Sequence, residues 1–351
     1  MKFRNETGDN FHNANQKRRV RYTIVFGVMV LAFLLIFILN VNIGNVHISV
    51  QDIWNILKEK GGNNVEYSII WKIRLPRVFM AALLGGALSL SGFLLQTFFA
   101  NPIAGPYVLG ISSGAKMVVA LTMIIFLKYW GAPSSYALII AAFAGALIST
   151  GFILLLSKKA NSVASLLVGG IMIGYICSAI TDFIVTFAED SDIVNLHGWS
   201  QGSFSGMSWS NVQVAAILVS ITLLLTVLLS KPIGAYQLGE AYAQSMGLNI
   251  KLFRIVLILL SSVFSACVTA FAGPISFVGI AVPYLVRKAF HTSKPLVIIP
   301  GTFLGGAIFC MFCDLITRTA FAPTEINIST VTSMLGAPIV IIMLLKREKG
   351  R

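Results

Sequence analysis

The feature that most constrains this chain is a succession of long apolar stretches separated by short polar ones. A backbone crosses a bilayer only as a helix or a closed barrel, because each N–H and C=O in the hydrocarbon needs a partner, and a helix needs about 20 apolar residues to do so. The apolar stretches lie at approximately residues 22–41, 76–99, 108–127, 134–157, 163–187, 211–230, 252–272, 274–286, 296–316 and 328–345. The pattern predicts an all-α, polytopic membrane protein with about ten transmembrane helices.

Composition excludes the main alternatives. Of 351 residues, 56% are hydrophobic and 11% are charged, whereas soluble domains carry about 25% charged residues. A soluble enzyme and a disordered chain are therefore excluded. All four cysteines lie in apolar runs and are interpreted as small buried hydrophobes. Cys310 and Cys313 form C-x-x-C without a second pair or a nearby His, so we expect no metal site.

The charge balance predicts an orientation. The chain has 26 Lys and Arg against 13 Asp and Glu, a net charge of +13. Cytoplasmic loops of membrane proteins are enriched in Lys and Arg, so the basic head at residues 1–21 is predicted to be cytoplasmic. Alternating crossings through a single transmembrane domain, residues 22–345, then place segment 231–254 and the tail 346–351 on the same side. This requires the short stretch 274–286 to cross as an interrupted, centrally packed helix.

Three polar segments interrupt the apolar pattern. Residues 48–60 have apolar side chains on one helical face and predict an amphipathic helix on the membrane surface. Residues 189–210 predict an ordered interfacial loop with about one helical turn. Segment 231–254 contains a helix-forming stretch between Gly239 and Gly247, and its exposed Glu240 favours protein docking over membrane burial.

Charges near the spans are few and therefore informative. Asp314 and Arg318 are four residues apart and predict a structural ion pair. Arg74 and Arg77 flank the start of the second stretch on the outer side, where they either snorkel at the helix end or dock an acidic partner. Asp182 faces either a cavity or interfacial water.

Small residues are abundant on the spans, among them Gly85, Gly86 and Gly92. They predict close helix packing, or alternatively helices that slide during a transport cycle. Catalytic signatures are missing: H-E-x-x-H does not occur, and the string Gly110–Lys116 lacks the spacing of a phosphate-binding loop. We therefore expect no enzymatic activity and no ATPase site on this chain.

Several longer motifs occur in a fixed order over most of the chain. They are Arg74-Leu75-Pro76-Arg77, Gly92 with Gln96, Asn101-Pro102-Ile103-Ala104, Leu109 to Ala115, Gly239-Glu240 with Gly247, Gly273 to Gly279, Asp314 with Arg318, and Leu335-Gly336-Ala337-Pro338. In these motifs the chain resembles the FecCD-type permeases of ATP-binding-cassette (ABC) importers, which carry iron chelates, haem or cobalamin. It departs from the family pattern at Pro283-Tyr284 and at Ile326-Asn327-Ile328.

The resemblance implies a type II ABC importer permease fold in a bacterial cytoplasmic membrane, with both termini cytoplasmic. It implies a second permease subunit, two cytoplasmic ATP-binding subunits and an extracytoplasmic substrate-binding protein as partners, within membrane lipid and without nucleic acid. We expect no cofactor on this chain, since ATP would bind the partner subunits.

The resemblance also implies roles for particular residues. The binding protein would dock on Arg74, Arg77 and Arg318. The ATPase-coupling segment would include Gly239, Glu240, Ala243 and Gly247. The translocation path or gate would include Gln96, Asn101, Ser162 and Ser165.

The function expected from these observations is import of an iron chelate, most simply a ferric siderophore, by alternating access driven by the partner ATPases. Haem or cobalamin import is the alternative within the class. A secondary transporter would need ionisable residues at mid-span for ion coupling, and a membrane-embedded enzyme would need converging carboxylates or histidines at one depth.

Overall fold

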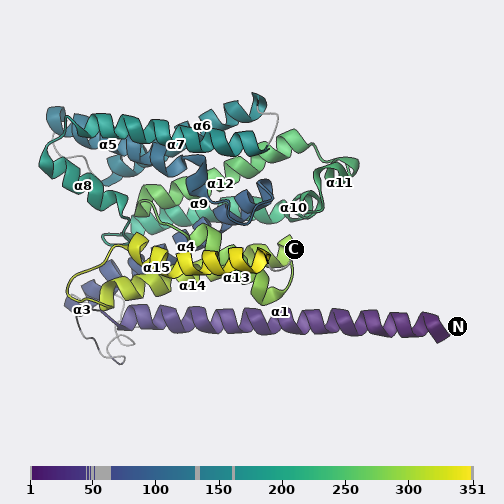
Figure 1. Ribbon diagram of the computed structural model, residues 1–351. Coiled ribbons are helices and arrows are strands. Elements are labelled where there is room, and N and C mark those ends of the chain that lie inside the picture. The colour runs from purple at the N-terminus through teal and green to yellow at the C-terminus, as the bar shows by residue number, and fades with distance from the viewer. Residues whose placement is uncertain are drawn as a thin grey trace.

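The computed structural model describes residues 2–44, 46, 48, 51, 65–130, 135–159 and 163–348. Side chains are described over the same ranges except at 2–14, 108, 125–130, 158–159, 163 and 347–348. Within this part of the chain the structure consists of helices and connecting loops, without a strand. The predicted all-α architecture is confirmed (Figure 1).

The helical elements follow one another along the chain, and most are connected by short loops. They are α1 Lys2–Asn42, α3 Val65–Ser68, the π-helical turn η1 Ile69–Arg74, α4 Leu75–Phe98, the 3₁₀ turn η2 Pro106–Leu109, α5 Ile111–Trp130, α6 Ser135–Lys159, α7 Val163–Val185, α8 Asp190–Ser200, α9 Trp209–Leu228, α10 Ser230–Gln237, α11 Glu240–Ser245, α12 Ile250–Ala272, α13 Val278–Phe290, α14 Pro295–Thr319 and α15 Ile328–Glu348.

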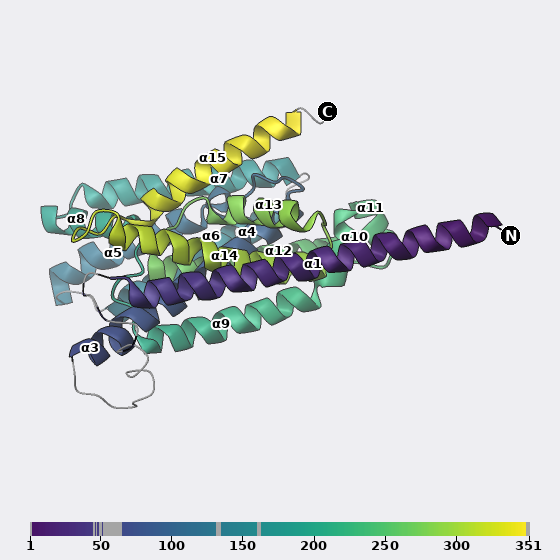
Figure 2. The ribbon, with the colours of Figure 1, turned by 90° about the horizontal axis from the view of Figure 1, so that it is seen from below.

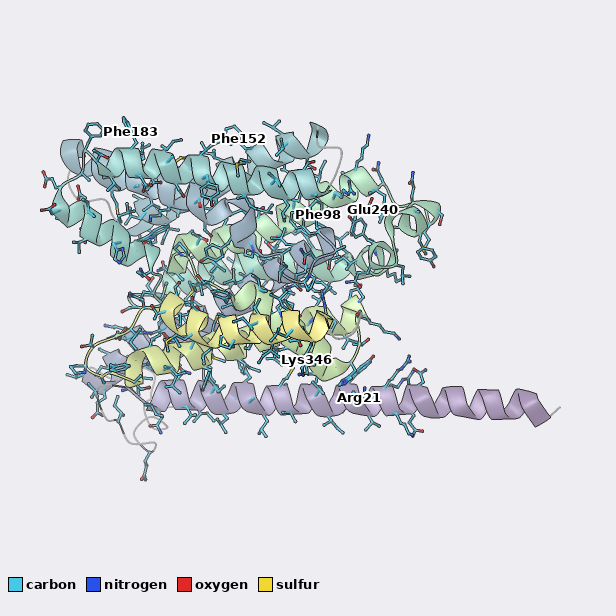
Figure 3. The ribbon with its side chains drawn as sticks, in the orientation of Figure 1. Arg21, Phe98, Phe152, Phe183, Glu240 and Lys346 are labelled. Atoms are coloured by element: carbon cyan, nitrogen blue, oxygen red, sulfur yellow. The ribbon has the colours of Figure 1, made fainter. Side chains whose placement is uncertain are left out.

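Each predicted apolar stretch coincides with one of these helices. Among the described residues, 8 helices are long and apolar enough to cross a membrane, with α3, η1 and α4 counted as one helix. The other two stretches correspond to α5, whose apolar part is Ile111–Ile124, and to α13, which has 13 residues. Large apolar side chains project outward, among them Phe152 on α6 and Phe183 on α7, which are 57% and 67% exposed (Figure 3). Such a surface suits lipid.

The helices run roughly side by side, and their ends define two poles of the molecule. Both termini and α11 lie at one pole, called the α11 pole below, and α3 and α8 lie at the other, the α3 pole (Figures 1 and 2). Helix α1 is continuous from Lys2 to Asn42, so the predicted head at residues 1–21 is a helical extension of the first apolar stretch, without a helix end at the boundary.

Helix α4 forms the centre of the bundle and packs against α14, α12, α13 and α9. Glycines allow the closest approaches. A Cβ added to Gly92 would lie 1.7 Å from the carbonyl oxygen of Gly279 on α13, and one added to Gly85 would lie 2.4 Å from the carbonyl oxygen of Gly306 on α14. Van der Waals contact between backbones, which drives helix association in lipid, therefore accounts for these glycines. The sliding motion stays a prediction.

The chain between α12 and α13 is not helical. Gly273 and Phe277 both have positive φ angles, of 73° and 63°, and the predicted helix 274–286 begins four residues later, at Val278. The correction follows from Gly273, whose left-handed backbone ends α12. The hydroxyl of Ser329 and the amide of Ser203 satisfy the carbonyls of Pro274 and Ala272, at 2.6 and 2.8 Å. Helix α13 packs against α4, α14, α15 and α1, as the prediction of a short, centrally packed helix requires.

The polar segments differ from expectation in one case. Segment 189–210 contains α8, a helix of 11 residues, whereas we expected about one helical turn. Asp190 and Asp192 in its first turn favour a helix N-terminus. Most of the predicted amphipathic helix at 48–60 lies outside the described residues. Segment 231–254 forms two short helices, α10 and α11, and the first turn of α12.

Candidate functional site

A buried ionic cluster joins α4 to α14 at the α3 pole. The Nε of Arg77 donates to both carboxylate oxygens of Asp314, at 3.0 and 3.1 Å, and its Nη2 lies 2.9 Å from Oδ1. The same guanidinium donates through Nη1 to both oxygens of Glu325, at 3.0 Å each. The Asp314 side chain is 1% exposed and that of Glu325 is 38% exposed. Arg77 thus bridges one buried and one accessible carboxylate.

Arg318 lies on the same cluster from one turn further along α14. Its Nε is 3.4 Å from Oδ2 of Asp314, so the predicted pair at this spacing is present. The nitrogen makes no hydrogen bond there, and Asp314 is bound more closely by Arg77. The stronger contact of Arg318 is from Nη2 to the side-chain oxygen of Asn40 on α1, at 2.6 Å. Asn40 itself donates to the carbonyl of Met311, at 3.1 Å.

Arg74 has a different set of partners. Its Nη1 donates to the carbonyls of Val41 and Asn42 at 2.7 and 2.8 Å, and its Nη2 donates to the carbonyl of Val46. These carbonyls belong to the end of α1 and the chain just after it, where helical carbonyls lack partners within the helix. Arg74 therefore caps the end of α1.

The three arginines predicted to dock a partner are thus largely internal. Arg74, Arg77 and Arg318 are 4%, 6% and 6% exposed. They nevertheless line one cavity of about 220 Å³ at the α3 pole, together with Glu325. Sequence reasoning missed Glu325 and Asn40 as members of this cluster. Asn40 carried a signal, since it is a polar residue at the end of an apolar stretch.

The second site lies at the α11 pole, in the segment predicted to couple to an ATPase. Glu240 begins α11 and forms an ion pair with Arg254 of α12. The hydroxyl of Tyr236 on α10 donates to the same carboxylate at 2.8 Å. Partial burial opposes the charged carboxylate, but the hydrogen bonds from Arg254 and Tyr236 hold the pKa of Glu240 below its ordinary value. Burial raises the pKa of Tyr236 to about 12, so the phenol keeps its proton as a donor.

Two glycines delimit α11. Gly239 and Gly247 have φ angles of 126° and 86°, a backbone region that glycine adopts without steric cost. Between them Ala243 is fully buried, whereas Tyr242 and Met246 are 49% and 65% exposed. Helix α11 is therefore anchored by one small residue and presents its larger side chains outward.

This segment contacts the end of α4 directly. The side-chain amide of Gln237 donates to the hydroxyl of Thr97 at 3.4 Å, and the hydroxyl of Tyr236 lies 3.4 Å from the carbonyl of Phe98. At the preceding residue of α4, the side-chain amide of Gln96 donates to the carbonyl of Ile280 on α13, at 3.2 Å. The end of α4 thus links α10 to α13.

A cavity of about 580 Å³, called the α11 cavity below, opens among these elements. It is lined by Gln96, Thr97, Phe98, Phe99, Ala100, Asn101, Pro102, Tyr236, Gln237, Gly239, Glu240, Arg287 and Ser293. Figure 3 shows Phe98 and Glu240 beside one another at this pole. The structure therefore brings two predicted gate residues, Gln96 and Asn101, together with two predicted coupling residues, Gly239 and Glu240.

Of the other two predicted gate residues, only Ser165 is described, and it does not line this cavity. Ser165 is exposed near the start of α7, and Ser162 lies outside the described residues.

Cys310 and Cys313 are buried thiols of α14. Within the described ranges, no group of three His, Cys, Asp or Glu residues is placed to hold a metal ion.

Comparison with known proteins adds to this geometry. A model of the FecCD transport family matches residues 31–346. The chain is 31% identical over 334 residues to the hemin transport system permease protein HmuU of Yersinia pestis, covering 95% of this chain and 98% of the relative. It is 34% identical over 339 residues to the vitamin B12 import system permease protein BtuC of Salmonella typhi, covering 97% and 99%.

A solved structure is also similar. It is a metal-chelate type ABC transporter in an inward-facing conformation, matched with a TM-score of 0.81 and 26% identity over 92% of this chain and 99% of the other. The helices and their order therefore match a transporter fold along nearly the whole chain.

Proposed function

This chain belongs to the FecCD transport family and is an ABC importer permease, and from that premise we propose that it translocates an iron chelate, with a ferric siderophore as the first candidate. The supporting observation is the kind of cargo named for its relatives. HmuU carries hemin, itself an iron chelate, and the similar solved structure is of a metal-chelate transporter. BtuC carries vitamin B12, so hemin and corrinoids are the alternative substrates.

We propose further that the α11 pole is cytoplasmic. Both termini lie there with α11 (Figure 1), and the basic residues Lys17, Arg18, Arg19 and Arg21 lie on the part of α1 toward that pole. The positive-inside bias favours this orientation. It places the α11 cavity where a soluble ATPase meets the membrane, and the buried ionic cluster on the outer side.

In this orientation α11 is the contact for the partner ATPase. Its exposed Tyr242 and Met246 supply contact area, and the ion pair of Glu240 with Arg254 fixes its angle to α12. The hydrogen bond from Gln237 to Thr97, with the close approach of Tyr236 to the carbonyl of Phe98, then carries any movement of this segment to the end of α4. ATP binding and hydrolysis on the partners would shift the permease between two packings of the same helices.

The arginine-lined cavity at the α3 pole is the proposed docking point for an extracytoplasmic binding protein. Arg74, Arg77 and Arg318 bring three positive charges to the cluster, against the two carboxylates of Asp314 and Glu325. The excess of one positive charge favours an acidic side chain of the partner. Since the guanidiniums are almost fully buried, that side chain would have to enter the cavity rather than meet a flat surface.

Reconstitution tests the proposed function. The permease, its second subunit, the ATPases and the binding protein are placed in liposomes, and uptake of a radiolabelled ferric siderophore, hemin or cyanocobalamin is measured. Uptake of the ferric siderophore that needs both ATP and the binding protein is expected. ATP-dependent uptake of hemin or cyanocobalamin alone would replace the proposed substrate, and uptake driven by an ion gradient without ATPases would replace the transporter class.

A further inference from the structure

Arg287 at the end of α13 is a partly buried cation without a carboxylate partner. Within the described part of the chain, Arg77, Arg254 and Arg318 each lie near an Asp or Glu, and Arg287 does not. Its guanidinium lies 5.4 Å from the centre of the Phe93 ring, a cation–π contact. This contact holds the group in place, and the described residues offer its hydrogen-bond donors no acceptor.

Those donors border the α11 cavity, which also contains an unpaired acceptor. Gln96 is 3% exposed, and its Nε2 is used by backbone carbonyls of α13, but its Oε1 has no hydrogen-bond partner. A buried polar atom without a partner costs about 1–3 kcal/mol and is rare in folded proteins. The cavity is thus lined by a cation without a carboxylate partner and by a glutamine whose buried oxygen the described residues do not satisfy.

Glu240, whose carboxylate borders the same cavity, already has partners within the chain. Glu240 forms an ion pair with Arg254 and accepts a hydrogen bond from Tyr236, so it does not neutralise Arg287. The cavity therefore keeps a net positive site next to α11. A positively charged, partly desolvated recess favours an anionic group.

We propose that Arg287 receives an acidic side chain of the partner ATPase, inserted into the α11 cavity beside α11. This rests on the proposed function, in which α11 contacts the ATPase, and it adds a second anchor to that contact. Charge complementarity and the shared lining residues Gly239 and Glu240 carry the argument.

The shape of the cavity favours a protein side chain over the transported chelate. All its lining residues come from the ends of α4 and α13, the loops after them, and α10 with α11. The cavity is therefore a recess in the α11 pole, and the predicted gate residues Gln96 and Asn101 lie in its wall. A recess of this kind suits a docked protrusion of a soluble partner.

Charge reversal at Arg287 tests the proposal, and Lys288 provides the matched control. Lys288 is the next residue of α13, is exposed, and does not line the cavity. The permease in lipid nanodiscs is titrated with its purified ATPase subunit, and affinity is measured for Arg287→Glu, Arg287→Gln, Arg287→Lys and Lys288→Glu. A hydrogen bond between charged groups is worth a factor of about 10 to 100 in affinity.

The expected result is a loss of about 10-fold or more for Arg287→Gln, a larger loss for Arg287→Glu, and a small change for Arg287→Lys and for Lys288→Glu. Reversal of one acidic residue on the ATPase should restore binding to Arg287→Glu. Equal affinities for the wild type and Arg287→Gln would overturn the proposal, even if substitutions in α11 abolish binding. If the wild type binds no ATPase at all, the proposed function itself fails.

The thermal midpoint of each purified variant is measured to check that the variant is folded. Arg287→Gln keeps a polar, hydrogen-bonding side chain, although a shorter one, and does not introduce a negative charge, so it decides the question if Arg287→Glu does not fold. A loss of affinity that is the same for Arg287→Gln and Arg287→Lys would show that packing on Phe93 matters instead of the charge, and would also overturn the proposal.

Discussion

Replacing Asp314 with Asn tests whether the buried ionic cluster holds α4, α14 and α1 together at the α3 pole. The substitution keeps the size of the side chain and one acceptor oxygen, but it removes the charge. Asp314 receives three close contacts from Arg77, at 2.9 to 3.1 Å, and a longer one from Arg318. After the change, Arg77 keeps only Glu325 as a charged partner, and Arg318 keeps Asn40.

The magnitude follows from these contacts. Removing one partner of a buried ion pair costs about 3–5 kcal/mol, since the remaining charge stays buried. Arg77 retains two hydrogen bonds to Glu325, and the Asn oxygen still accepts from Arg77, so we expect the lower end, about 3 kcal/mol. The assay is denaturant unfolding of the purified permease in mixed micelles, read by tryptophan fluorescence, together with the thermal midpoint.

A matched control is Asp182→Asn, the same chemical change at an exposed position of α7, where we expect less than about 0.5 kcal/mol. The double variant Arg77→Met with Asp314→Leu removes both charges and should lose less stability than the sum of the single changes. If Asp314→Asn is as stable as the control, the cluster does not stabilise the fold, and the arginines would be held for docking alone.

Three further predictions concern single contacts. Gly92→Ala should lower the free energy of unfolding by about 1–3 kcal/mol, because the added methyl group meets a carbonyl oxygen of α13. The control Gly151→Ala should leave it unchanged, because no atom lies within 4 Å of the added Cβ. The thermal midpoints of the two variants are compared. The pKa of Glu240 is lowered in the folded state, so its contribution to the stability of α11 is present above the ordinary pKa of Glu and is lost as pH falls through the lowered pKa. Hydrogen exchange of residues 239–247, corrected for intrinsic rates, should show this loss. In Arg254→Met the lowering of that pKa should shrink and the loss should move to higher pH. Tyr236→Phe should weaken ATP-driven uptake more than it weakens assembly with the ATPase, measured side by side in the same liposomes.

Much of the fold was predictable because it depends on local patterns. Apolar stretches of the length of a bilayer predicted the helices, and the shortness of stretch 274–286 predicted an interrupted one. The exact start of α13 was not predictable, because it depends on the left-handed backbone at Gly273 and on side chains from α15 that satisfy the intervening carbonyls. The length of α8 was underestimated, although Asp190 and Asp192 in its first turn favour a helix start at this point.

The candidate site shows the same division. The pair of Asp314 with Arg318 was predictable from a spacing of one helical turn. The contact of Arg77 with Glu325 joins residues 248 positions apart, and no pattern along the chain indicates it. The sequence therefore placed Arg77 near the helix end but not inside the protein. The sequence did not single out Arg287, because its lack of a carboxylate partner becomes visible only when its neighbours are placed.

Helix α4 has a consequence that follows from its position at both sites. Arg77 near its start belongs to the ionic cluster, and Gln96 near its end borders the α11 cavity. The two residues are 19 positions apart, a rise of about 28 Å along a helix, close to the thickness of the hydrocarbon core. Because a helix resists compression along its axis, α4 connects the ionic cluster rigidly to the α11 cavity. A displacement of either end is therefore expected at the other end as a translation or a rotation of the whole helix.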